Sequence, residues 1–162
     1  MTIRVGFGYD VHQLADGLRL VLGGVTVPHT KGLVAHSDGD VLLHSITDAL
    51  LGAANMRDIG FHFPDTDGAY KGVDSRELLK KSYSLLKQKG WLVENIDSTI
   101  CLQKPKLKDF IPAMQENIAT DLEIDIDAVS IKATTTEKLG FVGKEEGVSV
   151  YAVVLIKKAT TK

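Results

Sequence analysis

The sequence has a single cysteine, Cys101, which excludes an intrachain disulfide and a zinc site built from cysteine ligands. It lacks an excess of positive charge, and the net charge of −2 provides no broad field for binding nucleic acid. No apolar run approaches the length of a membrane span, and residues 2–9 resemble a strand rather than a signal or transit peptide. We therefore expect a protein of the bacterial cytoplasm, or of an organelle stroma if the chain is a trimmed precursor, with neither nucleic acid nor membrane as partner.

Two familiar phosphate-binding motifs are also missing. Gly6 and Gly8 begin a dinucleotide-binding fingerprint, but Val11 stands where its third glycine belongs. The segment 140–144 is too short for a Walker A loop. Any phosphate group must therefore be bound by other means.

The pattern along the chain predicts a single α+β domain spanning residues 1–162. We expect a mixed sheet of about four main strands, packed on one side by about three helices, plus a small hairpin at Gly23-Gly24. The expected strands are 2–11, 91–102, 129–133 and 148–156, and the expected helices are 41–54, 74–89 and 108–121. Residues 58–72 form a long loop, and the continuously apolar segment 148–156 is expected to be buried on both faces.

Three side chains suggest a metal site. Asp10 and His12 lie two apart at the end of a strand and project to the same side, although a polar pair at a loop entrance has the same spacing. His44 lies on an apolar helix between Asp40 and Asp48, where it is either a buried imidazole satisfied by a carboxylate or a third ligand held by one of them. Together, Asp10, His12 and His44 have the composition of a catalytic zinc site with one open position.

Two further segments suggest anion binding. Ser37 or Asp38 is expected to cap the helix at 41–54, whose N-terminus then faces an anion beside His36. The run 134–137 offers three threonines and Glu137, which suit phosphate and a hard cation such as Mg²⁺, although an edge strand with a capping turn has the same pattern. Lysines 104, 106 and 108 form a local cluster suited to a small anion.

Several ordered motifs resemble the 2-C-methyl-D-erythritol 2,4-cyclodiphosphate synthase family of the non-mevalonate isoprenoid pathway. They are Gly-Phe-Gly-Tyr-Asp-Val-His at 6–12, Ala-His-Ser-Asp-Gly-Asp-Val at 35–41, Thr-Asp-Ala-Leu-Leu-Gly-Ala at 47–53, Asp-Ile-Gly at 58–60, Phe-Pro-Asp-Thr-Asp at 63–67, Asp-Ser-Arg-Glu-Leu-Leu at 74–79 and Lys-Ala-Thr-Thr-Thr-Glu-Lys-Leu-Gly-Phe at 132–141. The resemblance implies a lyase that closes 4-diphosphocytidyl-2-C-methyl-D-erythritol 2-phosphate into a cyclic diphosphate and releases CMP. It also implies a homotrimer with sites between subunits.

The resemblance implies a role for each matching residue. Asp10, His12 and His44 would hold one Zn²⁺ per subunit, Glu137 would contact Mg²⁺ or Mn²⁺, and His36 and Thr135 would stabilise the transition state. The positions that match the methylerythritol phosphate pocket are Ser37, Asp58, Ile59, Gly60, Phe63, Pro64, Asp65, Thr66 and Asp67. Those that match the cytidine diphosphate pocket are Leu102, Gln103, Lys104, Pro105, Lys106, Leu107, Lys108, Ala133, Thr134, Thr135 and Thr136.

The chain departs from the family near Phe141. Many members carry an arginine followed by a glycine where this chain has Lys144 and Glu145. In the family this region lies near a central cavity implicated in binding isoprenoid diphosphates. Lysine keeps the positive charge but loses the bidentate fork, and Glu145 opposes it, which puts that binding in doubt but leaves catalysis untouched.

Two other functions are compatible with the same residues. A metal-dependent phosphohydrolase would use Asp10, His12 and His44 with water as the nucleophile and would release inorganic phosphate. A non-catalytic nucleotide-binding zinc protein would instead close the fourth position of the metal, with His62 as the expected extra ligand.

Overall fold

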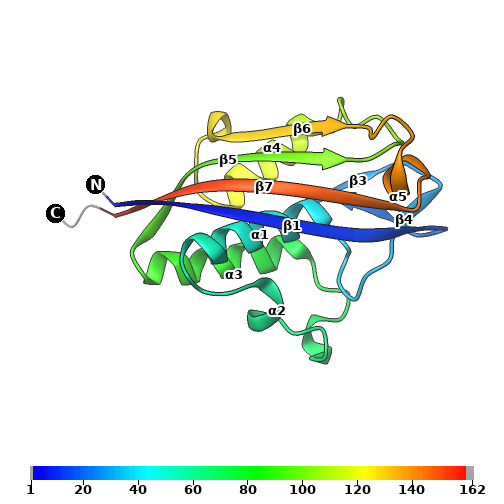
Figure 1. The fold of residues 1–162 in the computed structure, drawn as a ribbon. Helices are drawn as coiled ribbons and strands as arrows, with labels where there is room; N and C mark the ends of the chain where they lie inside the picture. The colour runs from blue at the N-terminus through cyan, green and yellow to red at the C-terminus, as the bar shows by residue number, and fades with distance from the viewer. Residues whose placement is uncertain (1, 160–162) are drawn as a thin grey trace.

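The computed structural model describes residues 2–159, which form a five-stranded mixed sheet and a small two-stranded sheet (Figure 1). The strands are β1 (Ile3–Asp16), β2 (Leu20–Leu22), β3 (Val25–Val27), β4 (Lys31–Leu33), β5 (Trp91–Cys101), β6 (Val129–Thr134) and β7 (Gly147–Lys158). The larger sheet has the order β4-β1-β7-β5-β6, in which β5 and β6 are parallel and the other pairs antiparallel. β2 and β3 form the predicted hairpin.

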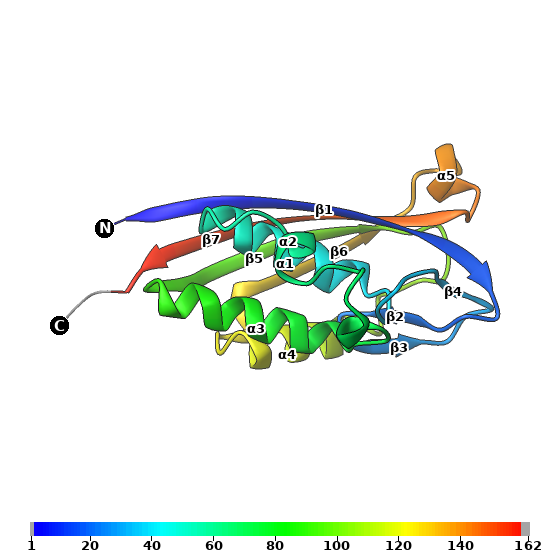
Figure 2. The same ribbon diagram turned by 90° about the horizontal axis from the view of Figure 1, so that it is seen from below.

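Three helices pack on one face of the larger sheet: α1 (Val41–Ala53), α3 (Ser75–Gln88) and α4 (Ile111–Asp121) (Figure 2). The core between them and the sheet includes the fully buried Ile46, Leu79, Met114 and Val150. The predicted α+β fold, with helices on one side of a mixed sheet, is therefore confirmed.

Short helical segments account for the differences from the predicted elements. They are α2 (Ile59–His62), η1 (Gly68–Tyr70), η2 (Ile126–Ala128) and α5 (Gly140–Gly143). The predicted loop 58–72 contains α2 and η1 because Asp58 and Asp67 accept hydrogen bonds from backbone N–H groups in those turns. α4 begins three residues later than predicted, with Pro112 in its first turn, where a missing N–H costs no helical hydrogen bond.

Gly6 and Gly8 allow close packing between β1 and α1. A Cβ atom added at Gly6 would lie 1.9 Å from the Ala49 carbonyl oxygen, and one at Gly8 would lie 1.9 Å from the Ser45 carbonyl oxygen. Only glycine tolerates such an approach. α1 therefore lies close enough to β1 for side chains of the two elements to meet.

Asp40 caps α1, so the prediction that Ser37 or Asp38 would do so is wrong. Its Oδ1 accepts a hydrogen bond from the Leu43 N–H at 3.1 Å. The cap lies two or three residues later than expected, which places Asp40 at the helix end and leaves Asp38 to bind the Ser75 N–H instead.

The same carboxylate of Asp40 holds the hairpin against α1. It accepts hydrogen bonds from the N–H groups of Gly23 at 3.0 Å and Gly24 at 2.7 Å, and its side chain is fully buried. Burial raises the pKa of Asp40 to about 6 although these N–H donors favour the charged form. One carboxylate therefore joins two segments that are distant in the sequence.

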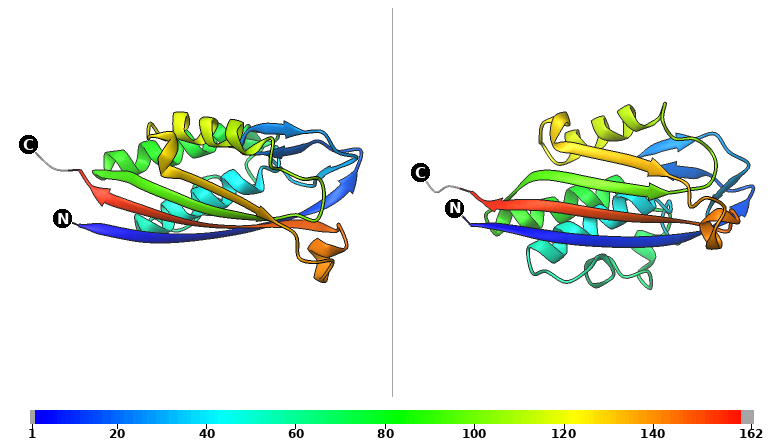
Figure 3. Two further views of the ribbon diagram at one scale, coloured as in Figure 1. Left: turned by 90° about the horizontal axis from the view of Figure 1, so that it is seen from above. Right: turned by 45° about the horizontal axis from the view of Figure 1, so that its top comes forward.

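The other face of the sheet is bare along most of its length, with α5 at one end (Figures 2 and 3). The prediction that residues 148–156 are buried on both faces is wrong for the single chain, because Tyr151 and Val153 on β7 are 41% and 43% exposed. Their neighbours on β1 are also apolar and exposed, namely Ile3, Val5, Phe7, Tyr9 and Val11. β1 and β7 together form an exposed apolar face.

Candidate active site

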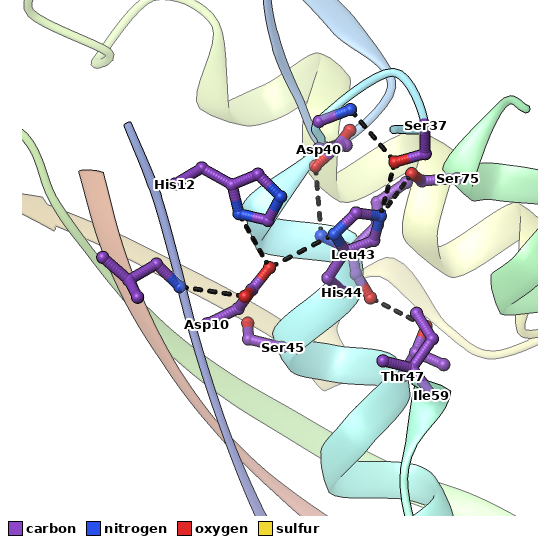
Figure 4. Close-up of polar contacts among 12 residues, drawn as sticks. Asp10, His12, Ser37, Asp40, Leu43, His44, Ser45, Thr47, Ile59 and Ser75 are labelled. Atoms are coloured by element: carbon purple, nitrogen blue, oxygen red, sulfur yellow. Dashed lines mark hydrogen bonds and ion pairs between the residues drawn. The ribbon is translucent and has the colours of Figure 1, made fainter. Parts of the chain in front are cut away.

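The three predicted metal ligands come together between β1 and α1 (Figure 4). Asp10 and His12 extend from β1 toward the helix, and His44 faces them from α1. His12 Nδ1 lies 3.1 Å and His44 Nδ1 lies 3.2 Å from Asp10 Oδ2. The ligand atoms of the three residues lie within 4.8 Å of one another.

These atoms suit a tetrahedral zinc ion. Zinc bonds of about 2.0–2.1 Å place neighbouring ligand atoms about 3.3 Å apart, close to the two separations from Asp10. His12 Nδ1 is buried and has no aligned hydrogen-bond partner within residues 2–159, despite the nearby carboxylate. A buried ring nitrogen without a hydrogen-bond partner is available to bind a metal, and three ligands leave a fourth tetrahedral position open.

The protonation of these groups also suits a cation. Burial raises the pKa of Asp10, but contacts with His12 and His44 outweigh it and lower the pKa to about 2. Burial lowers the pKa of His44, yet the Asp10 carboxylate outweighs that effect and raises it above the ordinary value. Because only unprotonated imidazole binds metal, acid should displace the ion from this site.

On the side away from Asp10, Ser75 and Ser37, rather than Asp40 or Asp48, support the His44 ring. Its Nε2 lies 2.8 Å from Ser75 Oγ and 3.3 Å from Ser37 Oγ. The prediction that Asp40 or Asp48 would hold the ring is wrong. Asp40 caps the helix, and Asp48 accepts a hydrogen bond from the first N–H of α2 at 2.7 Å. The His44 ring extends away from its own helix toward α3, out of reach of both.

A cavity of about 370 Å³ opens beside the ligand cluster, and we call it the histidine pocket. Its lining includes the three predicted metal ligands and the predicted catalytic residue His36. It also includes six of the predicted methylerythritol phosphate positions, namely Ser37, Ile59, Gly60, Phe63, Pro64 and Asp65. Asp58, Thr66 and Asp67, also expected here, are not in the lining, and two of them cap short helices instead. The lining also contains four residues that sequence reasoning missed, Ala35, Tyr70, Val73 and Leu78. The only signal for them was their position beside the matching motifs.

A second cavity, of about 330 Å³, lies where β5 and β6 end, and we call it the lysine pocket. Its lining is Leu102, Gln103, Pro105, Lys106, Leu107, Lys108, Ile111, Ala133, Thr134 and Thr135. All but Ile111 belong to the predicted cytidine diphosphate set. Lys104 and Thr136 of that set are not in the lining.

The two pockets are separate in the single chain. Val11, beside the metal ligands, pairs with Ser149, which pairs with Cys101, which pairs with Thr134 at the lysine pocket. Three strand spacings of about 4.8 Å place these ends about 14 Å apart. His36 and Thr135, both expected to stabilise one transition state, therefore line different pockets.

Of the remaining predicted residues, Glu137, Phe141 and Lys144 lie beyond β6, and His62 lies on α2. Glu137 is exposed in the turn after the three threonines, at a positive φ of 54°, and its N–H donates to Thr135 Oγ1 at 3.2 Å. Phe141, on α5, lines a third hollow of about 470 Å³ with residues of β1 and β7. Lys144 follows α5 and is not in its lining. His62 hydrogen-bonds the Met56 carbonyl oxygen at 2.7 Å and is not part of the ligand cluster, so it does not close the site.

Known proteins with similar sequences cover almost the whole chain. The model of the YgbB family matches residues 3–157. The 2-C-methyl-D-erythritol 2,4-cyclodiphosphate synthase of Bacteroides thetaiotaomicron is 64% identical over 158 residues, 98% of this chain and 99% of that protein. The synthase of the same name from Pseudomonas putida is 56% identical over 157 residues, 97% of this chain and 100% of that protein.

Solved structures of synthases with the same name have the same fold as this chain. A 2C-methyl-D-erythritol-2,4-cyclodiphosphate synthase in a CDP-bound form superimposes with a TM-score of 0.88 at 34% identity, covering 95% of this chain and 100% of that one. The bifunctional IspDF from Campylobacter jejuni gives a TM-score of 0.93 at 50% identity, covering 97% of this chain but only 42% of that one.

Within residues 2–159, no helix is both long and apolar enough to cross a membrane.

Proposed function

Because the chain belongs to the YgbB family and is an enzyme of the 2-C-methyl-D-erythritol 2,4-cyclodiphosphate synthase type, we propose that it closes 4-diphosphocytidyl-2-C-methyl-D-erythritol 2-phosphate into the cyclic diphosphate. An oxygen of the 2-phosphate bonds to the β-phosphorus while the bond from that phosphorus to the CMP phosphate breaks. CMP leaves, and the product enters isoprenoid precursor biosynthesis. The Asp10, His12 and His44 cluster beside a substrate-sized cavity is the observation that carries this proposal.

Asp10, His12 and His44 would hold zinc, and Glu137 would contact Mg²⁺ or Mn²⁺. When bound, these ions supply positive charge that polarises the diphosphate. The attacking 2-phosphate is already ionised, so the chain needs no general base. Its own residues must fold the substrate for in-line attack, and this orientation supplies a large part of the rate.

The histidine pocket would hold the methylerythritol phosphate part. His36 is exposed at its mouth and can donate a hydrogen bond to a phosphate oxygen, while Ser37 lies deeper. The apolar wall formed by Ile59, Phe63 and Pro64 excludes water from the reacting phosphates.

The lysine pocket would hold the cytidine diphosphate part. Lys106 and Lys108 offer charge to the diphosphate, and Thr134 and Thr135 offer hydroxyl groups. The CDP-bound structures of similar synthases, including IspF of Plasmodium falciparum, support a cytidine nucleotide as the ligand. Thr135 would then stabilise the transition state from this side.

A homotrimer would join the two half-sites. A single substrate must reach both pockets, which lie about 14 Å apart across one sheet, so we infer that the histidine pocket of one copy faces the lysine pocket of the next. The exposed apolar face of β1 and β7 supports this assembly. Phe7 is 61% and Val5 is 67% exposed in the single chain, and contact with another copy would bury both side chains. Phe141 and Lys144 would lie toward the centre of the trimer. We propose the cytoplasm as the setting of this protein, with residues 1–162 as one catalytic domain.

Phosphorus NMR of the purified protein with the cytidyl diphosphate substrate and Mg²⁺ tests the proposal. We expect a cyclic diphosphate and CMP, both lost when zinc is stripped and restored when zinc is added back. Release of inorganic phosphate without a cyclic product would identify a phosphohydrolase. An unchanged spectrum from folded, zinc-loaded protein would leave only nucleotide binding.

A further inference from the structure

A relay of three side chains lies behind the metal ligands, and the reaction as proposed does not use it. His44 Nε2 contacts Ser75 Oγ at 2.8 Å, and Ser75 Oγ in turn forms a short hydrogen bond to Asp38 Oδ1. Ser75 is fully buried and His44 is only 9% exposed. The relay thus runs from the metal site into the protein and ends at a carboxylate.

The direction of the hydrogen bonds follows from what each group can do. An ionised carboxylate only accepts, so the Ser75 hydroxyl donates its single hydrogen to Asp38. Ser75 Oγ can then only accept from His44, which places the imidazole proton on Nε2. In this tautomer His44 Nδ1 turns its lone pair toward Asp10 Oδ2, 3.2 Å away, an arrangement that a metal ion between the two atoms would stabilise.

Asp38 is itself fixed by backbone groups from two segments. Its Oδ2 accepts from the Ser75 N–H at 3.0 Å, at the start of α3, and its Oδ1 accepts from the Asp40 N–H at 3.1 Å. The Asp38 N–H donates to the Val73 carbonyl oxygen at 3.2 Å. The carboxylate therefore locks the loop that carries His36 and Ser37 onto α3, and it holds the Ser75 hydroxyl in one orientation.

Ser37 does not replace Ser75 in this role. Its Oγ lies 3.3 Å from His44 Nε2, farther than Ser75, and it also accepts from the Gly39 N–H at 3.2 Å. Ser37 lines the histidine pocket, where substrate competes for its hydroxyl, whereas Ser75 is outside the lining.

We propose that Asp38 and Ser75 are positioning residues that set the tautomer and orientation of His44 for metal binding. The inference rests on the proposed function in taking zinc as the resident ion. Partners behind a metal-bound histidine commonly change metal affinity by about 10–100-fold when removed. Because Asp38 also holds the loop that carries His36, removing Asp38 would make both His44 and this loop more mobile.

The test compares Ser75→Ala with Ser82→Ala. Ser82 lies on the same helix and is equally buried, but its hydroxyl has no hydrogen-bond partner within the described residues. We expect Ser75→Ala to weaken zinc binding about 10–100-fold in competition with a chelator, Asp38→Asn to weaken it about 10-fold, and Ser82→Ala to leave it unchanged. Equal zinc affinity for Ser75→Ala and Ser82→Ala would overturn the proposal.

The tautomer provides a second readout that needs no metal. In metal-free protein at alkaline pH, Ser75 favours a proton on His44 Nε2, whereas the Asp10 carboxylate, 3.2 Å from Nδ1, favours one on Nδ1. The imidazole ¹⁵N shifts of His44 should therefore report more of the Nε2 tautomer in wild type than in Ser75→Ala. A wild-type proton solely on Nδ1 would overturn the proposal even if Ser75→Ala failed to fold. If wild-type protein bound no zinc but showed the Nε2 tautomer, the zinc assignment would fail and the relay would stand.

Discussion

The histidine pocket and the lysine pocket are built in opposite ways. The first rests on buried polar side chains, with Asp40 and Ser75 fully enclosed and His44 nearly so. The second is formed by a loop and strand ends, and Lys106, Thr134 and Thr135 are exposed. A metal site must be rigid before its ion arrives, whereas a nucleotide pocket can be completed by its ligand and by a neighbouring copy. The histidine pocket should therefore respond to substitution by losing its ion or its fold, and the lysine pocket by losing affinity.

The largest effect is expected for His44→Ala. The variant should lose zinc and lower turnover about 1,000-fold, because a metal supplies several kcal/mol of charge stabilisation and about 1.4 kcal/mol corresponds to a factor of ten. Steady-state kinetics and metal analysis of the purified variant check this together. His29→Ala is the matched control, since its Nε2 has no partner within residues 2–159 and lies outside the pocket linings. Retained zinc with normal turnover in His44→Ala would remove it from the ligand set.

Asp40→Ala should have the next largest effect, on stability. It leaves the buried N–H groups of Gly23 and Leu43 and the half-buried N–H of Gly24 without their acceptor, at a cost of about 3–5 kcal/mol in free energy of unfolding. Urea unfolding measures the loss, with the exposed Asp16→Ala as control. A loss below about 1 kcal/mol would mean that the hairpin and α1 do not depend on this carboxylate.

The two pockets also differ in how much of them the sequence predicts. The spacing of Asp10 and His12 on a strand correctly predicts that both project to one side, and the lysine pocket follows its contiguous segment almost residue by residue. The partner of His44 is out of reach of such reasoning. Ser75 lies 31 residues away on another helix, and only the packing of α3 against α1 brings the two together.

The fold shows the same division. The spacing of apolar residues along the chain predicts the three long helices and the four long strands, because a helix or strand with one buried side repeats its apolar residues at a characteristic period. β7 is apolar as predicted, but Tyr151 and Val153 are exposed in the single chain. An apolar sequence pattern does not distinguish a residue buried by its own chain from one buried by another copy. The cap of α1 is decided by the hairpin at Gly23, which sequence spacing does not reveal.

The pH dependence of stability offers a smaller test of the buried scaffold. The folded protein holds the Asp40 proton more tightly than the unfolded chain, since the pKa rises from 3.8 to about 6. This contribution is therefore present below about pH 4 and is lost as pH rises through about 6, by about 3 kcal/mol. Asp40→Asn should remove this slope, so the difference in unfolding free energy between wild type and variant should shrink as pH rises. A difference that is constant with pH would contradict the raised pKa.

The smallest effect is expected in the lysine pocket. Lys106→Ala should weaken CDP binding about 10-fold, the value of one charge-assisted hydrogen bond at an exposed site, without changing zinc content or unfolding free energy. Calorimetric titration with CDP measures it, with the exposed Lys80→Ala of α3 as control. Loss of zinc in Lys106→Ala would show that the two pockets are coupled within one chain, against the contrast drawn above.

The division of one active site between two copies is tested most directly by mixing inactive variants. His44→Ala disables the histidine pocket, and the double variant Lys106→Ala/Thr135→Ala disables the lysine pocket. If the site lies between neighbouring copies, random co-assembly in equal amounts should restore roughly a quarter of wild-type activity, the chance that an intact histidine pocket faces an intact lysine pocket. Activity no higher than that of the separate variants, in assemblies shown to contain both chains, would contradict the account.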